Sequence, residues 1–238
     1  MRYLRGAAMD DGYEGESDYA FTLPATRALP DITFETVTVL VGDNGTGKST
    51  LVEALAVAAG FNAEGGSKNL RFSTHSTHSN LARALVLTFD RMPRWGWFFR
   101  AETYYGMASY IATDDDPAAG IKGLFPDLHN RSHGESFVTL MESRMMSDGL
   151  YLLDEPESAL SFVGQLRLLR IMHEAIGQGA QFILATHSPL LMAFPGAAIY
   201  ELDDTGARRV HYDEVDTVSQ WRTFLADPDR YFHHLFSN

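Results

Sequence analysis

Residues 41–50, VGDNGTGKST, constrain the fold more than any other stretch of this chain. They fit the pattern G-x-x-x-x-G-K-[ST] in full. The glycines allow backbone N–H groups to converge on phosphate oxygens, where a Cβ would obstruct the turn. The apolar run before the loop (36–41) predicts a buried strand, and the run after it (49–59) predicts a helix closed by Gly60. A phosphate-binding loop between a strand and a helix is therefore predicted.

Each part of this loop has an expected role. Lys48 brings a compact positive charge to the β- and γ-phosphates of a nucleotide, and Ser49 offers its hydroxyl to Mg²⁺. The N-terminus of the following helix adds a favourable dipole for an anion. We expect the nucleotide-binding residues to be Gly42, Asp43, Asn44, Gly45, Thr46, Gly47, Lys48, Ser49 and Thr50.

Composition excludes several classes of protein. The 238 residues are 45 % hydrophobic and 21 % charged, which is the range of a globular protein, and we expect one domain over residues 1–238. No apolar run is long enough to cross a bilayer, and the acidic N-terminus does not fit a signal peptide, so a cytoplasmic protein without a membrane partner is expected. The absence of cysteine excludes disulfides and thiolate metal sites. The net charge of −12 disfavours binding to nucleic acid.

Polar residues follow two further apolar runs. LYLLDE ends in Asp154 and Glu155, and FILATHS ends near His187. Acids at the carboxyl end of a parallel strand point into the crevice where ligands bind. We expect Asp154 to hold Mg²⁺, Glu155 to polarise an attacking water as general base, and His187 to contact the γ-phosphate. The alternatives are solvated acids at a strand end and a histidine satisfied in the core.

Alternation of strands and helices predicts an α/β fold with a largely parallel sheet covered by helices on both faces. An antiparallel element is expected at residues 197–204 and 207–215, paired around Thr205 and Gly206. Residues 84–89 and 96–102 are predicted to form a second hairpin with one apolar face. Helices are predicted over 103–112, 134–146, 158–176, 216–226 and 228–236.

These motifs, in this order, resemble those of the ATP-binding-cassette (ABC) ATPases, which are P-loop NTPases. The segment RSHGESF (131–137) resembles the signature S-G-G-Q of that family, and its alternative is a capped helix start. The resemblance covers about Phe21 to Phe236 and is strongest to small stand-alone predicted ATPases related to RecF-like and chromosome-maintenance heads. It implies ATP with Mg²⁺, hydrolysis to ADP, and an ATP-dependent homodimer in which the signature grips the partner's nucleotide through Ser132, His133, Gly134 and Glu135.

The chain departs from this family in its Q-loop. The four glutamines, Gln165, Gln178, Gln181 and Gln220, all follow the signature, so the Q-loop glutamine has no match. Ser73, Thr74 or His75 is expected to do its work. The histidines of THSTHSN offer a metal site as a weaker alternative. The adenine-stacking candidates are Tyr19, Phe21 and Phe34, each of which has a place in the core as its alternative.

The leading functional hypothesis is an Mg²⁺-dependent ATPase whose dimerisation acts as a switch on a protein effector. An ATP-gated interaction module with little turnover is the first alternative. A DNA-repair or defence ATPase follows from kinship, although the acidic charge is unfavourable. The energy-supplying subunit of a transporter is disfavoured, because the missing glutamine lies where such subunits couple to membrane helices.

Overall fold

The computed structural model describes residues 2–16, 18–63, 65–67, 79–104, 133–145 and 148–237. Within these ranges, a six-stranded sheet forms the centre of the molecule. Five of its strands run parallel, and β8 pairs with β7 in the antiparallel sense. In spatial order the strands are β4 (Gly96–Arg100), β5 (Leu150–Asp154), β6 (Gln181–Ala185), β2 (Val37–Gly42), β7 (Ala198–Asp203) and β8 (Gly206–Val210).

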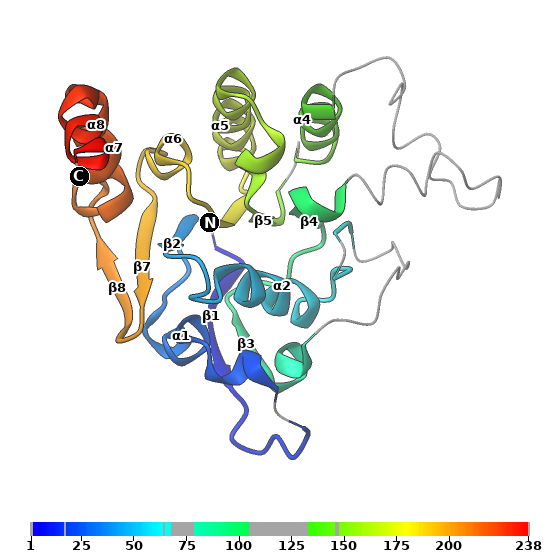
Figure 1. The fold of residues 1–238 in the computed structure, drawn as a ribbon. Coiled ribbons are helices and arrows are strands. Elements are labelled where there is room, and N and C mark those ends of the chain that lie inside the picture. Colours follow the sequence, from blue (N-terminus) through cyan, green and yellow to red (C-terminus); the bar gives the residue numbers. More distant parts are fainter. Residues whose placement is uncertain are drawn as a thin grey trace.

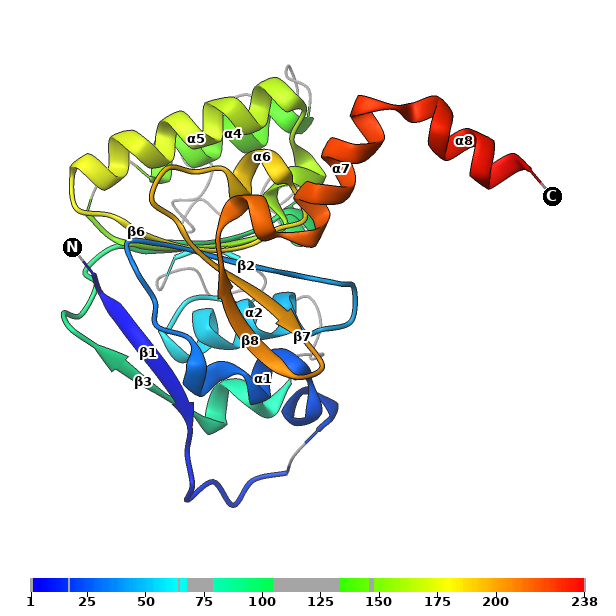
Figure 2. The same ribbon diagram turned by 90° about the vertical axis from the view of Figure 1, so that its left-hand side faces the viewer.

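Helices cover both faces of this sheet (Figures 1 and 2). Because the central strands are apolar on both sides, they bury both faces against helices, as parallel strands generally do. One face lies against α4 (His133–Arg144), α5 (Phe162–Gly177) and α6 (Pro189–Met192). The other face lies against α1 (Pro24–Arg27) and α2 (Lys48–Ala58). The predicted α/β fold, with its largely parallel sheet and one antiparallel hairpin, is confirmed.

The expected hairpin of residues 84–89 and 96–102 is wrong. Strand β3 (Leu85–Phe89) pairs instead with β1 (Leu4–Met9) in a separate two-stranded sheet, whereas β4 runs parallel to β5 in the main sheet. Trp97, Phe98 and Phe99 are all buried, so β4 has two apolar faces. A strand of that kind belongs inside a sheet covered on both sides.

The N-terminal strand is attached to the main sheet through Gln181. The side-chain carbonyl of Gln181 accepts hydrogen bonds from the backbone N–H groups of Tyr3 and Leu4, both at 2.8 Å. Its amide group donates to the carbonyls of Leu4 and Glu35 at 2.7 and 2.9 Å. This fully buried amide is therefore well satisfied, as a polar group in a core must be.

The helix predicted from residue 158 begins four residues later. Residues Pro156–Ala159 form a 3₁₀ turn, Leu160 is extended, and the Ser161 side chain caps α5 by accepting from the N–H of Gly164. Ser161 is a good N-cap, which explains the later start. The helices predicted near the C-terminus are confirmed as α7 (Asp216–Ala226) and α8 (Pro228–Phe236), and they project from the body (Figure 2).

Candidate functional site

Four neighbouring strands end at one edge of the main sheet. In the register of the parallel strands, Arg100 lies opposite Asp154, Asp154 opposite Ala185, and Ala185 opposite Leu40. The phosphate loop that follows β2, the acids that end β5 and the histidine after β6 are therefore brought to the same edge. This is the edge at which open α/β sheets bind ligands.

The backbone of the phosphate loop requires glycine at its ends. Gly42 has φ 143°, and a Cβ there would lie 2.3 Å from the carbonyl oxygen of Leu202. Gly47 has φ 90° and caps α2, and a Cβ there would lie 2.9 Å from the side chain of Leu23. The loop thus turns directly into the N-terminus of a helix of eleven residues, which is a favourable place for an anion.

Lys48 is the only lysine in the described part of the chain, and its side chain is buried. Its ammonium group donates to the carbonyls of Gly42 and Asp43 at 2.9 and 2.8 Å. Burial lowers the pKa of Lys48, while nearby carboxylates, with Glu155 first among them, oppose that shift. The loop therefore holds a desolvated cation over its own backbone, where a charge-assisted contact to phosphate is strong.

Asp154 is buried at the end of β5. Burial raises its pKa to about 6, and a hydrogen bond from Ser49 and the charge of Arg100 act in the opposite direction. By hydrogen-bond geometry, no donor among the described residues reaches its Oδ1 atom. A buried carboxylate oxygen without a donor, beside a serine hydroxyl, fits a divalent cation such as Mg²⁺, which takes one or two protein oxygens together with phosphate oxygens.

Glu155 has an unusual backbone. Its φ of 45° is the only positive value of a non-glycine residue in the described ranges. Such a conformation costs about 1–3 kcal/mol and is found mostly at functional sites. The N–H of Glu155 donates to the carbonyl of Ala185, which continues the contact between β5 and β6 past Asp154. The turn separates the two acids: the Asp154 side chain is buried, whereas that of Glu155 is 39 % exposed and lies 3.7 Å from Nε2 of His187.

Sequence reasoning missed a polar layer beneath His187. The carboxylate of Glu157 accepts a hydrogen bond from the backbone N–H of His187 at 2.5 Å, and burial raises the pKa of Glu157. Ser188, which caps α6, donates to the side chain of Gln165 on α5. These contacts fix the segment that carries His187. The third acid in the run DEPE is the sequence signal that indicates Glu157.

A cavity of about 440 Å³ lies above the strand ends. Among the described residues, no group of three or more acidic or histidine side chains is arranged to hold a metal ion without further ligands. A metal here would therefore need oxygens from a nucleotide. The cavity is lined by Ser49, Ala101, Glu102, Asp154, Glu155 and Ser158.

Some of the remaining predicted site residues lie within the described ranges and others lie outside them. Gly134 and Glu135 lie in the first turn of α4, and a Cβ on Gly134 would lie 2.9 Å from the carbonyl of Ala159. Phe34 is fully buried and cannot stack on a base, which corrects its place among the adenine candidates, whereas Tyr19 is 68 % exposed. The Ser132 backbone and the His133 side chain lie outside the described residues, as do the Q-loop candidates Ser73, Thr74 and His75, both histidines of THSTHSN, and most of the helix predicted over 103–112.

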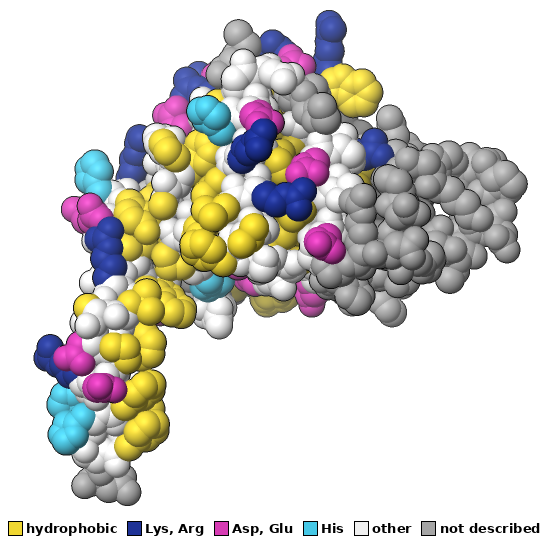
Figure 3. Space-filling model, turned by 90° about the horizontal axis from the view of Figure 1, so that it is seen from above, with side chains coloured by type: hydrophobic (Ala, Val, Ile, Leu, Met, Phe, Trp, Pro, Cys, Tyr) yellow, Lys and Arg dark blue, Asp and Glu magenta, His cyan; other side chains and the backbone are white. Residues whose placement is uncertain are grey.

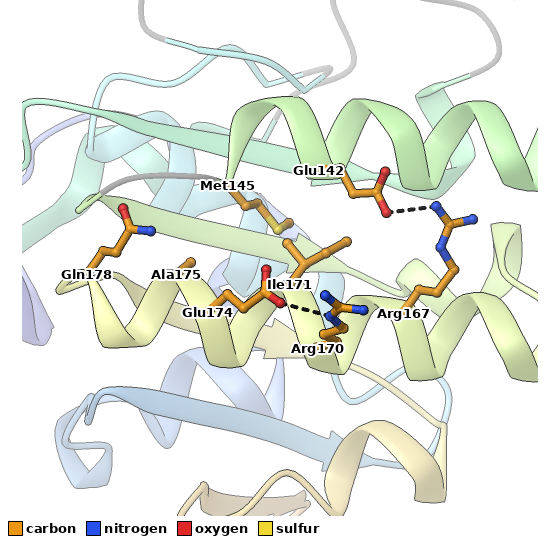
Figure 4. Close-up of a pocket in the computed structure, with 8 residues that line it drawn as sticks. All are labelled: Glu142, Met145, Arg167, Arg170, Ile171, Glu174, Ala175 and Gln178. Carbon is orange, nitrogen blue, oxygen red and sulfur yellow. Dashed lines mark hydrogen bonds and ion pairs between the residues drawn. The ribbon is translucent and has the colours of Figure 1, made fainter.

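A second cavity of about 290 Å³ lies between α4 and α5 (Figure 4). Ion pairs border it, one joining Glu142 to Arg167 across the two helices and one joining Arg170 to Glu174 along α5. None of its lining residues belongs to the phosphate loop or to the strand ends. This cavity therefore lies apart from the phosphate loop and from the acids at the strand ends.

Comparison with known proteins agrees with this geometry. The chain is 31 % identical over 228 residues to the hemin import ATP-binding protein HmuV of Nocardia farcinica, an alignment that covers 87 % of this chain and 73 % of that protein. The chain belongs to the ABC-type P-loop ATPases. It is also 24 % identical over 159 residues to the cytochrome c biogenesis ATP-binding export protein CcmA of Rhodopseudomonas palustris, covering 63 % of this chain and 78 % of CcmA.

Two further comparisons place the family motifs on the fold. Residues 37–93 and 136–193 match the family described as "AAA domain, putative AbiEii toxin, Type IV TA system", and these ranges contain the phosphate loop and the ends of β5 and β6. The structure of cbiO1 from Clostridium perfringens, part of the ABC transporter complex cbiONQ, has the same fold, with a TM-score of 0.51, 17 % identity and 99 % coverage of both chains. Among the described residues, no helix has the length and apolar character of a membrane span.

Proposed function

We propose that this chain binds ATP with Mg²⁺ and hydrolyses it, working as one domain over residues 1–238. The observation that carries the proposal is the convergence, at one edge of the sheet, of a buried lysine, a buried carboxylate with an unpaired oxygen, and a strained glutamate beside a histidine. Membership of a family whose members are generally ATPases supports it.

The residues divide the chemistry among themselves. Lys48 and the N–H groups at the start of α2 bind the phosphates, and Ser49 and Asp154 hold Mg²⁺, which would neutralise charge on the phosphate oxygens. Glu155 stands at the exposed side of the cavity, where it accepts a proton from water. His187, 3.7 Å from Glu155, contacts the γ-phosphate. The left-handed backbone at Glu155 keeps the general base apart from the metal carboxylate.

We further propose that ATP joins two copies of the chain. The cavity is open to solvent on the side of Glu102 and Ser158, both of which are exposed. The start of α4, at Gly134, lies against the carbonyl of Ala159, which follows Ser158. The expected signature and the cavity wall are therefore close in space within one copy of the chain. A second copy would cover the nucleotide with its own α4 start, and hydrolysis would separate the copies and act as a switch on an effector.

Light scattering behind a sizing column tests this proposal with wild type and Glu155→Gln. The glutamine keeps the size of the side chain but cannot accept a proton, so hydrolysis should fall by a factor of roughly 10² or more. ATP binding should persist, because Lys48, Ser49 and Asp154 remain. The variant should therefore accumulate as a dimer with ATP and Mg²⁺, and a variant that stays monomeric at saturating ATP would contradict the switch.

A second candidate function is favoured by the names of the relatives. HmuV is named for import and CcmA for export, so the chain would be the ATP-binding subunit of a transporter. Co-purification with an integral membrane protein from the native host would favour this candidate. A chain that purifies without one, and that dimerises with ATP as described above, favours the switch in the cytoplasm.

A further inference from the structure

Exposed apolar side chains are concentrated in two parts of the chain. Among the thirteen large hydrophobic residues that are exposed in the described ranges, six lie on α7 and α8, which we call the C-terminal arm. Three more, Phe162, Val163 and Leu166, lie at the start of α5. The six residues of the arm are Trp221, Leu225, Tyr231, Phe232, Leu235 and Phe236. Clusters of this kind, unlike scattered single residues, indicate a contact with a partner.

The apolar residues of the arm form one stripe. On α7 and on α8 they are spaced by four positions, so on each helix they share a face. The ring of Phe224 packs against Trp221 on α7 and against Tyr231 and Phe232 on α8, which makes the stripe continuous between the helices. Figure 3 shows the hydrophobic side chains along one flank of the arm and the charged ones along the other.

The arm and the start of α5 border the same space. Helix α5 begins at the carboxyl edge of the sheet, because only residues 155–161 separate it from β5. The arm projects beyond that edge, on the side of the phosphate loop (Figure 2). Its apolar stripe faces the space in front of the edge (Figure 3). A second copy that covers the nucleotide would occupy this space.

The area of the two surfaces limits what they can do alone. Large apolar side chains bury about 150–250 Å² each, so the stripe, whose members are 40–74 % exposed, offers roughly 600 Å². The start of α5 offers roughly half as much. If each copy gave both an arm and an α5 start, it would bury roughly 600 Å², whereas a stable interface takes about 800 Å² from each partner. The contact therefore needs a second contribution, such as a shared nucleotide.

A lipid surface is the other occupant that an apolar helix face could take. Helices that lie on membranes are rich in Lys and Arg along the polar face. In α8 there is one arginine, Arg230, and it follows an acid, Asp229. The net charge of −12 also opposes approach to anionic headgroups. The charges of the chain therefore favour a protein partner.

We propose that the arm of each copy packs its apolar stripe against the start of α5 of the other copy when ATP joins the two. The partner of the arm is thus a second copy of this chain, and the contact rests on the ATP-dependent pairing of the proposed function. Such an exchange is reciprocal, as a two-fold dimer requires. Val215 and Val218 are buried at the base of the arm and hold it to the body. In the ligand-free monomer the stripe stays exposed.

The first test measures the dimer dissociation constant by sedimentation velocity, with a non-hydrolysable ATP analogue and Mg²⁺. The double variant Leu235→Ser and Phe236→Ser should raise this constant by roughly tenfold or more, because two apolar side chains are lost from the contact. The matched control is Met92→Ser with Trp95→Ser, which changes two equally exposed side chains just before β4, at the opposite edge of the sheet, and it should dimerise normally. At dilutions where the chain is monomeric, all three proteins should bind the analogue equally.

The second test uses the absence of cysteine from the chain. The double variant Leu166→Cys and Leu235→Cys is treated with a mild oxidant and run on a non-reducing gel. A disulfide-linked dimer should form with the ATP analogue and Mg²⁺, and at least several-fold more slowly without them. Each single-cysteine variant is the control and should stay unlinked, because a disulfide requires two residues that meet closely.

The outcomes separate this inference from the proposed function. An unchanged dissociation constant in the serine variant, or a double-cysteine variant that does not link, would overturn the arm contact. If wild type fails to bind the analogue, the proposed function is refuted. The contact is then read without nucleotide at high protein concentration, where wild type should self-associate weakly and the serine variant should not, and equal behaviour would overturn it. Retention of wild type but not of the serine variant on phosphatidylglycerol vesicles would assign the stripe to lipid and equally overturn it.

Discussion

The carboxyl edge of the main sheet and the C-terminal helices depart from ordinary globular structure in opposite directions. At the sheet edge, Lys48 and Asp154 are charged groups that are only 4 % and 5 % exposed. Along α7 and α8, large apolar side chains face solvent, with Leu225 66 % and Phe236 72 % exposed. Figure 3 shows the second region as a band of hydrophobic side chains on the projecting helices.

The two regions differ in the contacts that offset the burial of charged groups and the exposure of apolar side chains. Each buried charge has specific partners, such as the loop carbonyls around Lys48 and the guanidinium beside Asp154. On the helices, aromatic rings contact one another, with Phe224 packed edge-on against both Trp221 and Phe232. The directional contacts of charged groups at the sheet edge select a ligand by its charge and geometry. The aromatic contacts on α7 and α8 select no particular ligand.

The largest expected effect is on nucleotide binding by Lys48→Met. Methionine keeps much of the side-chain volume but removes the buried charge that faces the phosphates. Because hydrogen bonds to charged groups contribute about 1.5–3 kcal/mol each, ATP affinity should fall by roughly 10²-fold. Equilibrium binding of a fluorescent ATP analogue measures it. Arg27→Met, which removes an exposed arginine from the neighbouring α1, is the control and should bind normally.

A smaller effect is expected from Asp154→Asn, which should increase the free energy of unfolding of the ligand-free protein. The pKa of Asp154 is about 6 in the folded chain against 3.8 ordinarily, so the folded state holds its proton more tightly than the unfolded state does. The ionised group therefore opposes folding, increasingly as the pH rises from about 4 to 6 and fully above that. Asparagine should stabilise the ligand-free protein at pH 8 by about 2–3 kcal/mol.

Thermal unfolding at two pH values checks this expectation. The gain at pH 5 should be about half of that at pH 8, because wild type is then mostly protonated when folded. Mg²⁺ should stabilise ATP-bound wild type but not the variant. An asparagine variant that melts below wild type at pH 8 would show that Asp154 is needed by the fold rather than by a ligand.

The smallest effect is expected on the projecting helices. The double variant Leu235→Ser and Phe236→Ser changes side chains that are 74 % and 72 % exposed, so the free energy of unfolding should change by less than about 0.5 kcal/mol per site. Urea denaturation measures it, and ATP affinity should be unchanged. A loss of several kcal/mol would mean that α8 is covered in solution, and the contrast between the two regions would disappear.

Local sequence patterns predicted the centre of the fold and most of the site's chain positions. The phosphate loop, β5 with Asp154 and Glu155, β6 before His187, and the β7–β8 hairpin lie where their residues indicated. Each depends on short-range signals, such as a full glycine pattern or an apolar run that ends in polar residues.

The errors came from long-range pairing. Residues 85–89 and 96–100 are close in sequence, but their partners are residues 4–9 and 150–154, and local periodicity does not encode such pairings. A hairpin of residues 84–89 and 96–102 does not predict that Arg100 lies beside Asp154, because that contact depends on the pairing of β4 with β5. The run FFRAE, like LYLLDE, is an apolar stretch followed directly by charged residues. If its strand is assigned to the main sheet, this pattern places Arg100 at the carboxyl edge, where Asp154 lies.

The attachment of the N-terminal strand by Gln181 has a consequence for synthesis on the ribosome. Tyr3 and Leu4 are synthesised well before the side chain that fastens them to the main sheet, which follows 177 positions after Leu4. At about 5–20 residues per second, that interval lasts roughly 10–35 s. During this time β1 can pair with β3, which is its strand partner within the described ranges, and a two-stranded pair is marginally stable in water. The nascent chain must therefore keep β1 from pairing with other partners until Gln181 has been synthesised.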